Sequence, residues 1–353
     1  MSPAMKRNQR WRLIITIVTF VALGIVVYAL REQIFQTIEQ IRQVNSLALL
    51  LIIPLQVINY HAYTKMYRSI FAILGENIAY RPMYKVALEL NFVNNVFPSG
   101  GVSSFSYFGL RMREFNVSAT KSTLVQLMRF VMVFISFQVL LFFGLFFLAL
   151  GGQANDIMIL ITGSLATTLF ILTALATYVI GSERRIKNTF VSITKIINKV
   201  IHIFRPKHQE TINISRVQNI FTNLHENYMI IKSNFGQLRR PLFYGLLANL
   251  TEVMSLYTVY VAFDKWVNPG TVIIGYAVAN FAGLISILPG GVGVYEGLMT
   301  GVMAAGGVPA AVTLPATIMY RILTQALQLP IGGYFYNRFI RRRDRAKASE
   351  HPV

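Results

Sequence analysis

Two arginines lie inside apolar segments of the sequence, where a charged side chain is rare. Arg129 interrupts the apolar stretch from Leu124 to Leu150. Arg321 interrupts the stretch from Leu314 to Tyr336. An arginine at depth in a bilayer costs at least about 2.5–3.5 kcal/mol, so such residues are functional candidates. Because the guanidinium fork binds phosphate through two hydrogen bonds, the arginines predict a site for a phosphate that enters from the lipid.

Two acidic residues in apolar segments offer a second interpretation of the same charges. Arg321 can pair with Glu252 or with Glu296 as a buried ion pair that holds helices together, since charges inside a membrane usually find partners. This pairing and phosphate binding can coexist. The two carboxylates are also the groups to test as proton carriers.

Polar residues recur at helical spacing beside these charges. Thr324, Gln325 and Gln328 follow Arg321 at three, four and seven positions, which places all four on one helix face. Two other stretches carry the same pattern, through Asn249, Glu252 and Ser255 and through Gln56, Asn59 and Tyr63. We expect these faces to line a polar cavity.

Two apolar regions are broken by proline and glycine where a membrane crossing would be continuous. The region from Tyr84 to Leu110 breaks at the Pro-x-Gly-Gly run Pro98-Ser99-Gly100-Gly101, and that from Thr271 to Gly306 breaks at Pro289-Gly290-Gly291. Each half is too short to span a bilayer, which predicts two re-entrant helical hairpins. Their bare backbone amides at a helix start would attract an anion, which makes Ser99, Gly100, Gly101, Gly290 and Gly291 candidate ligands. The alternative is that proline and glycine merely kink ordinary membrane helices, in which both are common.

The composition excludes most soluble classes of protein. Of the 353 residues, 54% are hydrophobic and only 13% are charged, whereas soluble domains have about 25% charged residues. The net charge of +19 arises from basic residues between apolar stretches, which favours membrane topology and anionic lipid over nucleic acid. The chain has no cysteine, its five histidines are scattered, and no phosphate-binding loop is present. We therefore expect neither a metal nor a cofactor.

Six stretches are long and apolar enough to read as complete crossings. They are Leu13–Leu30, Leu47–Tyr63, Leu124–Leu150, Ile157–Ile180, Leu242–Phe263 and Leu314–Tyr336. Basic residues precede the first of them and follow the last, so an even number of crossings puts both termini in the cytoplasm of a plasma-membrane protein. The periodic segment from 183 to 240 predicts a cytoplasmic helical hairpin.

The two broken regions belong to longer units that resemble each other. The prolines of the breaks are 191 positions apart (289 minus 98), and an arginine follows each after 31 or 32 positions. In the six-crossing topology, residues 46–150 and 242–336 run in opposite directions. The fold class predicted is an all-α polytopic membrane protein with two inverted repeats, a single membrane domain over residues 1–340 and a basic tail over 341–353. Transporters with alternating access build their central site in this way.

The second break carries a more specific signal. The run Leu288-Pro289-Gly290-Gly291-Val292-Gly293-Val294-Tyr295-Glu296, with Tyr320-Arg321 downstream, resembles the transmembrane flippase domain of the lysylphosphatidylglycerol synthase family (multiple peptide resistance factor). The run from Asn94 and Asn95 to Gly101, followed by Arg129, is similar to that family's first-half motif. The resemblance covers roughly residues 10 to 340. It implies a protein that binds or moves a lipid between leaflets, often as a homodimer, with Arg129, Arg321, Glu296 and the break residues along the headgroup path.

The resemblance is incomplete in two places. The chain ends soon after Lys347, so we expect no soluble aminoacyl-transferase domain and no synthase activity. Val102-Ser103-Ser104 follow the first break, where many relatives carry charged residues, which leaves the preferred headgroup open between an anionic or aminoacylated phospholipid and a glycolipid.

We expect a lipid flippase-like protein rather than an enzyme. Two alternatives stay open: a non-transporting membrane module that partners a separate lipid-modifying transferase, and a secondary transporter of a small anion.

Overall fold

A computed structural model describes residues 44–97, 102–182, 184–185, 188, 214–286 and 289–350. Within these residues every regular element is a helix, as the sequence predicts. The predicted crossing Leu13–Leu30 and the first break at 98–101 lie outside the described residues.

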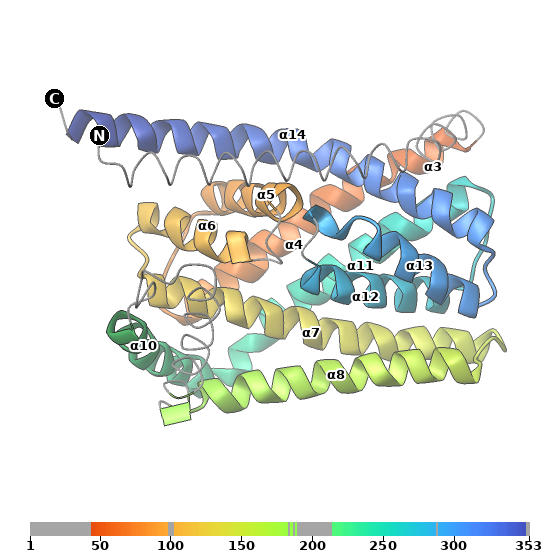
Figure 1. Ribbon diagram of the computed structural model, residues 1–353, viewed down its shortest axis with the longest axis horizontal. Coiled ribbons are helices and arrows are strands. Elements are labelled where there is room, and N and C mark those ends of the chain that lie inside the picture. Colours follow the sequence, from red (N-terminus) through yellow and green to blue (C-terminus); the bar gives the residue numbers. More distant parts are fainter. Residues whose placement is uncertain are drawn as a thin grey trace, which may run out of the picture.

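Long helices run along the longest axis of the molecule (Figure 1). They are α4 (Ile52–Ile73), which follows the short α3 (Ser46–Leu50), then α7 (Ala119–Leu150), α8 (Asp156–Ile180), α11 (Arg239–Ala262) and α14 (Ala310–Glu350). Four helical segments of the described part are long and apolar enough to cross a membrane: Ser46–Ile73, Ala119–Leu150, Asp156–Val179 and Phe235–Ala262. These four coincide with predicted crossings.

The predicted crossing Leu314–Tyr336 differs from these four in its hydropathy. It lies within α14, which has 41 residues and is therefore longer than a bilayer requires. This helix is nevertheless not among the four apolar segments. The face that carries Arg321, Gln325 and Gln328 is polar, and it lowers the mean hydropathy of the helix.

Shorter helices flank the two proline and glycine breaks. Before and after the first break lie α5 (Tyr80–Val96) and α6 (Val102–Met112), the latter extended by η1 (Arg113–Phe115). Around the second lie α12 (Pro269–Ile285), η3 (Pro289–Gly291) and α13 (Val294–Ala305). The longest of them has 17 residues. At 1.5 Å per residue such a helix measures about 25 Å, less than the roughly 30 Å of a hydrocarbon core.

The helices of the two halves pack against each other in a crossed arrangement. α4 lies along α11, α5 packs on α14, and α12 packs on α7. The last contact brings backbones together, because a Cβ atom on Gly270 would stand 2.2 Å from the carbonyl oxygen of Gly144. Small residues permit this approach where lipid supplies no hydrophobic force between helices. The second break, at Pro289–Gly291, lies at the centre of the molecule.

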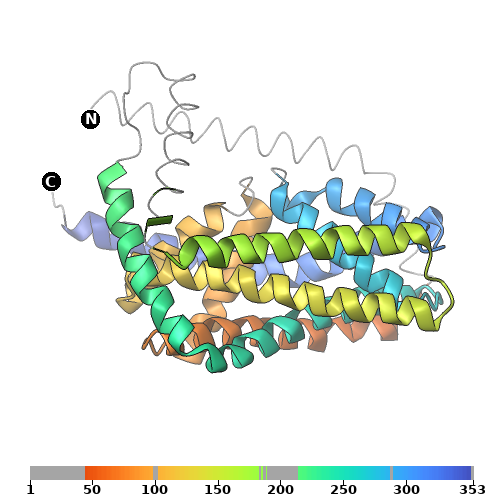
Figure 2. The ribbon, with the colours of Figure 1, turned by 90° about the horizontal axis from the view of Figure 1, so that it is seen from below.

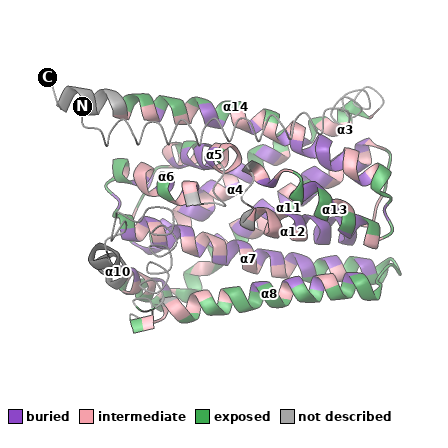
Figure 3. Ribbon diagram, in the orientation of Figure 1, coloured by how far each residue is buried: buried purple, intermediate pink, exposed green. Residues whose placement is uncertain are grey.

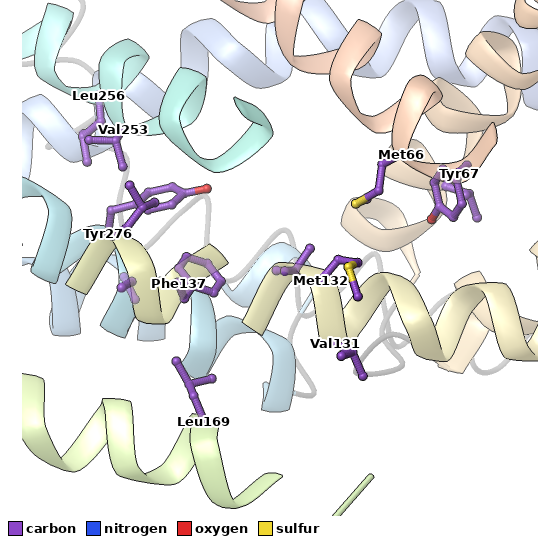
Figure 4. Close-up of a cluster of buried hydrophobic side chains, with 14 of the residues drawn as sticks. Met66, Tyr67, Val131, Met132, Phe137, Leu169, Val253, Leu256 and Tyr276 are labelled. Carbon is purple, nitrogen blue, oxygen red and sulfur yellow. The ribbon is translucent and has the colours of Figure 1, made fainter. Parts of the chain in front are cut away.

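Apolar side chains fill the interior and also cover the outside. Met66, Met132 and Phe137 belong to the buried cluster between the helices (Figure 4). On the outside, α8 is exposed along its length (Figure 3), and Phe170 on it is 64% exposed. An apolar outer surface is typical of a protein whose surroundings are lipid.

One helix crosses the bundle at its end. α10 (Ile214–Ser233) lies across the ends of α7 and α8 (Figure 2) and is followed by η2 (Phe235–Leu238). It belongs to the predicted hairpin of residues 183–240. Most of the first half of that hairpin lies outside the described residues.

Candidate functional site

A polar cavity of about 220 Å³ lies at the centre, where the broken helices meet the long ones. Its walls come from α4, α5, α7, α11, α12, α13 and α14, so both halves of the chain contribute. The lining is mainly amide, phenol and charged side chains, including Asn59, Tyr63, Tyr67, Asn91, Asn95, Arg129, Glu252, Tyr276, Asn280, Tyr295, Tyr320, Arg321, Gln325 and Gln328.

Most of the site residues suggested by the sequence are at this cavity. Six of them line it: Asn95, Arg129, Glu252, Gly290, Arg321 and Gln325. Glu296 lies beside it, in contact with Arg321. Gly291 is turned away, since a Cβ atom there would meet the Cα of Gly283 at 3.2 Å. Ser99, Gly100 and Gly101 lie outside the described residues.

Arg321 is held by the second break. Its Nη1 donates to Oε1 of Glu296 in an ion pair, and its Nη2 donates to the carbonyl oxygen of Gly290 at 2.5 Å. The other carboxylate oxygen of Glu296 accepts the backbone N–H of Gly293 at 2.7 Å, which caps the start of α13. Of the two pairings the sequence allowed, the structure has the one with Glu296. This guanidinium is therefore neutralised, and it fastens α14 to the turn.

Glu252 has neutral partners instead. Tyr320 donates its hydroxyl to Oε2 of Glu252 at 2.5 Å, and Nε2 of Gln56 donates to the same oxygen at 3.4 Å. No ion pair among the described residues includes Glu252. Oε1 is thus the carboxylate oxygen that stays available to a donor in the cavity.

Arg129 is the cation of the cavity that has no carboxylate. Its guanidinium carbon lies 5.7 Å from the ring centroid of Tyr63, 5.9 Å from that of Tyr67 and 5.2 Å from that of Phe130. Its Nε is buried without a hydrogen-bond partner. The guanidinium also hydrogen-bonds the hydroxyls of Tyr63 and Tyr67. Its partners are thus neutral and its Nε–H is unused, so Arg129 can still bind an anion.

Side-chain amides form a chain from the first half to the second. Asn91 donates to Gln328 at 2.6 Å, and Gln328 donates to Gln56 at 2.6 Å. Gln56 then donates to Ser255 at 3.1 Å as well as to Glu252. The chain connects α5, α14, α4 and α11 across the cavity wall. Buried amide networks of this kind fix the relative position of helices in a membrane.

The tip of α5 touches the second break. Asn95 is held on its own helix by Asn91, through Nδ2 bonds of 2.9 and 3.0 Å. Its Oδ1 would stand 2.9 Å from a Cβ atom on Gly290. Gly290 has a φ of +59°, which favours glycine, so both the conformation and the space require a residue without a side chain.

Several residues that line the cavity were not predicted from the sequence. Tyr67, Tyr276, Asn280 and Asn91 were not selected, although each lines the cavity. Helical spacing could have found them: Tyr60, Tyr63 and Tyr67 lie on one face, as do Tyr276 and Asn280. Tyrosine did not stand out because it is common in membrane proteins near the interface.

The arrangement suits recognition better than bond making. It offers a guanidinium without a carboxylate partner, an unpaired carboxylate oxygen and many neutral hydrogen-bonding groups. No group of three acidic or histidine side chains that could hold a metal occurs in the described part of the chain.

Comparisons with known proteins agree with this membrane character. The profile of the lysylphosphatidylglycerol synthase TM region matches residues 13–332. A UPF0104 membrane protein of Methanothermobacter thermautotrophicus is 29% identical over 171 residues, which is 47% of this chain and 49% of that protein. A UPF0104 membrane protein of Methanocaldococcus jannaschii is 23% identical over 274 residues, 75% of this chain and 77% of that protein. The alignment therefore spans about half of the first relative and about three quarters of the second.

Proposed function

Since the chain belongs to the lysylphosphatidylglycerol synthase TM family, we propose that it is a flippase-like membrane protein that binds a lipid headgroup in the central cavity and moves it between leaflets. The family is the one that the motifs at Pro289 and Pro98 predict, so that prediction is confirmed. The lipid would be a phospholipid or glycolipid whose acyl chains stay in the bilayer while its headgroup crosses through the cavity.

The observation that carries this proposal is the state of Arg129. Burying a guanidinium without a counterion is unfavourable in a membrane protein, so a chain that does so has a use for the free charge. Its buried and unpaired Nε points to a ligand that is absent when the protein is alone. A phosphate or phosphodiester group supplies the two acceptor oxygens that match the guanidinium fork.

Glu252 and Gln325 extend the recognition beyond phosphate. The free Oε1 of Glu252 would accept a hydrogen bond from an ammonium or hydroxyl group of the headgroup. Gln325 lines the cavity and makes no hydrogen bond within the described part of the structure, so its amide is also open to a ligand. Anionic, aminoacylated and sugar headgroups all carry groups of these kinds.

Movement between leaflets would follow from the crossed packing. We interpret residues 46–150 and 242–336 as inverted repeats, and the helix pairs α5/α6 and α12/α13 as re-entrant hairpins. The contacts of α5 with α14, of α12 with α7 and of α4 with α11 support this, because each relates one half to the other. Rocking of one repeat against the other would open the cavity to each leaflet in turn.

The proposal includes a role and a location for the whole chain. We place it in the plasma membrane with both termini in the cytoplasm, acting on lipid without modifying it. A homodimer and a separate lipid-modifying transferase are the partners we propose to look for.

Reconstitution into liposomes tests the proposal. Vesicles would contain fluorescent phosphatidylglycerol, phosphatidylethanolamine or a glycolipid, and a membrane-impermeant quencher would report which leaflet each label occupies. We expect exchange above that of empty vesicles for at least one lipid, and at least a tenfold loss in Arg129→Gln, since a hydrogen bond to a charged group contributes about 1.5–3 kcal/mol. Arg113→Gln is the matched control, because Arg113 is exposed and forms no ion pair within the described residues.

Two results would contradict the proposal. Exchange that is equal in Arg129→Gln and the parent protein would remove the proposed headgroup site. No exchange of any lipid, with specific lipid retained after purification, would indicate instead a binding module that serves a separate transferase.

A further inference from the structure

A second cavity, of about 530 Å³, lies on the outside of the bundle between α4, α5 and α14. Most of its wall is aliphatic or aromatic, from Ile53, Val57, Leu88, Leu327, Ile331 and Phe335. Three of these are well exposed: Ile53 at 47%, Val57 at 56% and Ile331 at 49%. The cavity is therefore a groove open to the surroundings of the protein, and its walls match the hydrocarbon of a lipid chain.

One end of the groove is basic. Arg81 and Lys85 line it from the first two turns of α5, and both are exposed. Neither is part of an ion pair within the described residues. Lys85 lies over the ring of Phe335 with its Nζ 5.4 Å from the ring centroid, so its charge is held at the wall. No acidic residue lines the groove among the residues that the structure describes.

Phenol groups accompany the two cations. Tyr80 and Tyr84 line the same end of the groove, and the Nζ of Lys65 lies 5.9 Å from the ring centroid of Tyr80. Tyrosine, lysine and arginine are the residues that gather at the level of lipid headgroups, where an apolar body and a polar tip are both satisfied. The groove thus has a headgroup end and an acyl end.

We infer that this groove is a binding site for one anionic glycerophospholipid of the surrounding bilayer. Its phosphate lies between Arg81 and Lys85, and one acyl chain lies along α4 and α14 against Val57 and Ile331. Charge decides the class of lipid, because two cations without counterions favour a headgroup with net negative charge over a zwitterionic one. This inference does not depend on whether the central cavity moves lipid between leaflets.

The groove adjoins the central cavity through a thin wall. Tyr60 and Gln328 line both. Gln328 is fixed there by its hydrogen bonds of 2.6 Å to Asn91 and Gln56. A lipid in the groove is therefore one layer of side chains away from the polar residues of the centre, which is where a headgroup would wait before entering.

The absence of cysteine from the sequence allows a local measurement. Ile331→Cys creates a single thiol in the groove, which would carry a bimane fluorophore in vesicles of mixed composition. Phosphatidylglycerol and phosphatidylcholine with identical brominated chains then report, by quenching, how strongly each lipid occupies the position. Phe170→Cys, on the exposed face of α8, is the control position. Arg239→Gln/Arg240→Gln removes two exposed charges elsewhere and is the control for net charge.

We expect brominated phosphatidylglycerol to be preferred at Ile331→Cys by about fivefold or more, since each basic residue near a membrane surface contributes about 1 kcal/mol toward anionic lipid. The preference should vanish when Arg81→Gln/Lys85→Gln is added, and persist with Arg239→Gln/Arg240→Gln. Quenching at Phe170→Cys should be the same for both lipids.

Equal quenching by the two lipids at Ile331→Cys, or a preference that survives Arg81→Gln/Lys85→Gln, would overturn the inference. Val57→Trp fills the groove without touching the cations and gives an independent check. Phosphatidylglycerol retained by that variant in native mass spectrometry should fall several-fold. Arg129→Gln should leave the quenching at Ile331→Cys unchanged, which separates this site from the proposed transport pathway.

Discussion

Phe105 on α6 stacks on Phe130 of α7, with ring centroids 5.7 Å apart. Each of them precedes by 191 positions a member of the Glu296–Arg321 ion pair (296 minus 105, and 321 minus 130). The second half of the chain thus has an ion pair where the first half has an aromatic pair. Arg129, the neighbour of Phe130 in the chain, forms no ion pair within the described residues.

A carboxylate introduced at position 105 should neutralise the charge of Arg129. We expect Phe105→Glu to weaken binding of an anionic lipid headgroup in the central cavity by about tenfold, because the new carboxylate would compete with phosphate for one charge-assisted hydrogen bond. Phe105→Leu, which keeps the position apolar, should bind lipid like the parent protein. Titration of detergent-purified protein with phosphatidylglycerol, followed by native mass spectrometry, measures this. Unchanged binding in a folded Phe105→Glu protein would contradict the role given to Arg129.

The ion pair should matter for stability more than for binding. Arg321→Gln and Glu296→Gln each leave a buried charge alone, which typically costs about 3–5 kcal/mol. The double variant Arg321→Gln/Glu296→Gln should lose less than the sum of the two. Arg129→Gln should cost less than either, since Arg129 has no carboxylate partner and loses only its contacts with neutral aromatic side chains. Thermal unfolding in detergent distinguishes these variants, and additive losses in the double variant would show that the pair is not coupled.

Periodicity and charge predict much of this fold because they act locally. The four apolar segments, the break at Pro289 and the polar face of α14 could all be predicted from spacing alone. The predicted crossing Leu314–Tyr336 is less apolar than a crossing exposed to lipid, because one face of α14 lines the cavity. The spacing of residues identifies the polar face of a helix. It does not show whether that helix also has a face exposed to lipid.

The partners of the charges could not be predicted in the same way. Both Glu252, in the middle of α11, and Glu296, in the first turn of α13, were candidates for Arg321. The choice depends on the turn at Gly290 and Gly293, whose positive φ values bring the first turn of α13 against α14. The packing of helices in three dimensions also decides that Gln328 joins a hydrogen-bond chain whereas Gln325 does not.

These two glutamines provide a matched test of that chain. Gln328→Leu would leave Nδ2 of Asn91 and Oε1 of Gln56 without the hydrogen bonds that Gln328 makes to them, and an unsatisfied buried polar group costs about 1–3 kcal/mol. We expect a clear loss of thermal stability. Gln325→Leu removes no hydrogen bond within the described residues, so its stability should stay within about 0.5 kcal/mol of the parent protein, as for substitutions that break no interaction. Equal stability of the two variants would mean that the chain does not hold α5, α14 and α4 together.

The contact between the tip of α5 and the second break can be tested with one methyl group. In Gly290→Ala the Cβ atom would stand 2.9 Å from Oδ1 of Asn95 and 3.2 Å from Nη2 of Arg321. Neither side chain can move away freely, since Asn91 holds the first and Glu296 holds the second. The left-handed conformation alone costs a residue with a Cβ atom about 1–2 kcal/mol. We therefore expect Gly290→Ala to lower thermal stability and to reduce lipid exchange together.

Gly297→Ala is the control for this methyl group. Gly297 lies three residues into α13, and a Cβ atom there meets nothing within 4 Å. Alanine is favoured over glycine inside a helix by about 1 kcal/mol, so this variant should be as stable as the parent protein or more so. If Gly290→Ala matched Gly297→Ala in both stability and exchange, the fold would not need the close contact between Asn95 and Gly290. The tip of α5 would then be free to move independently of α13.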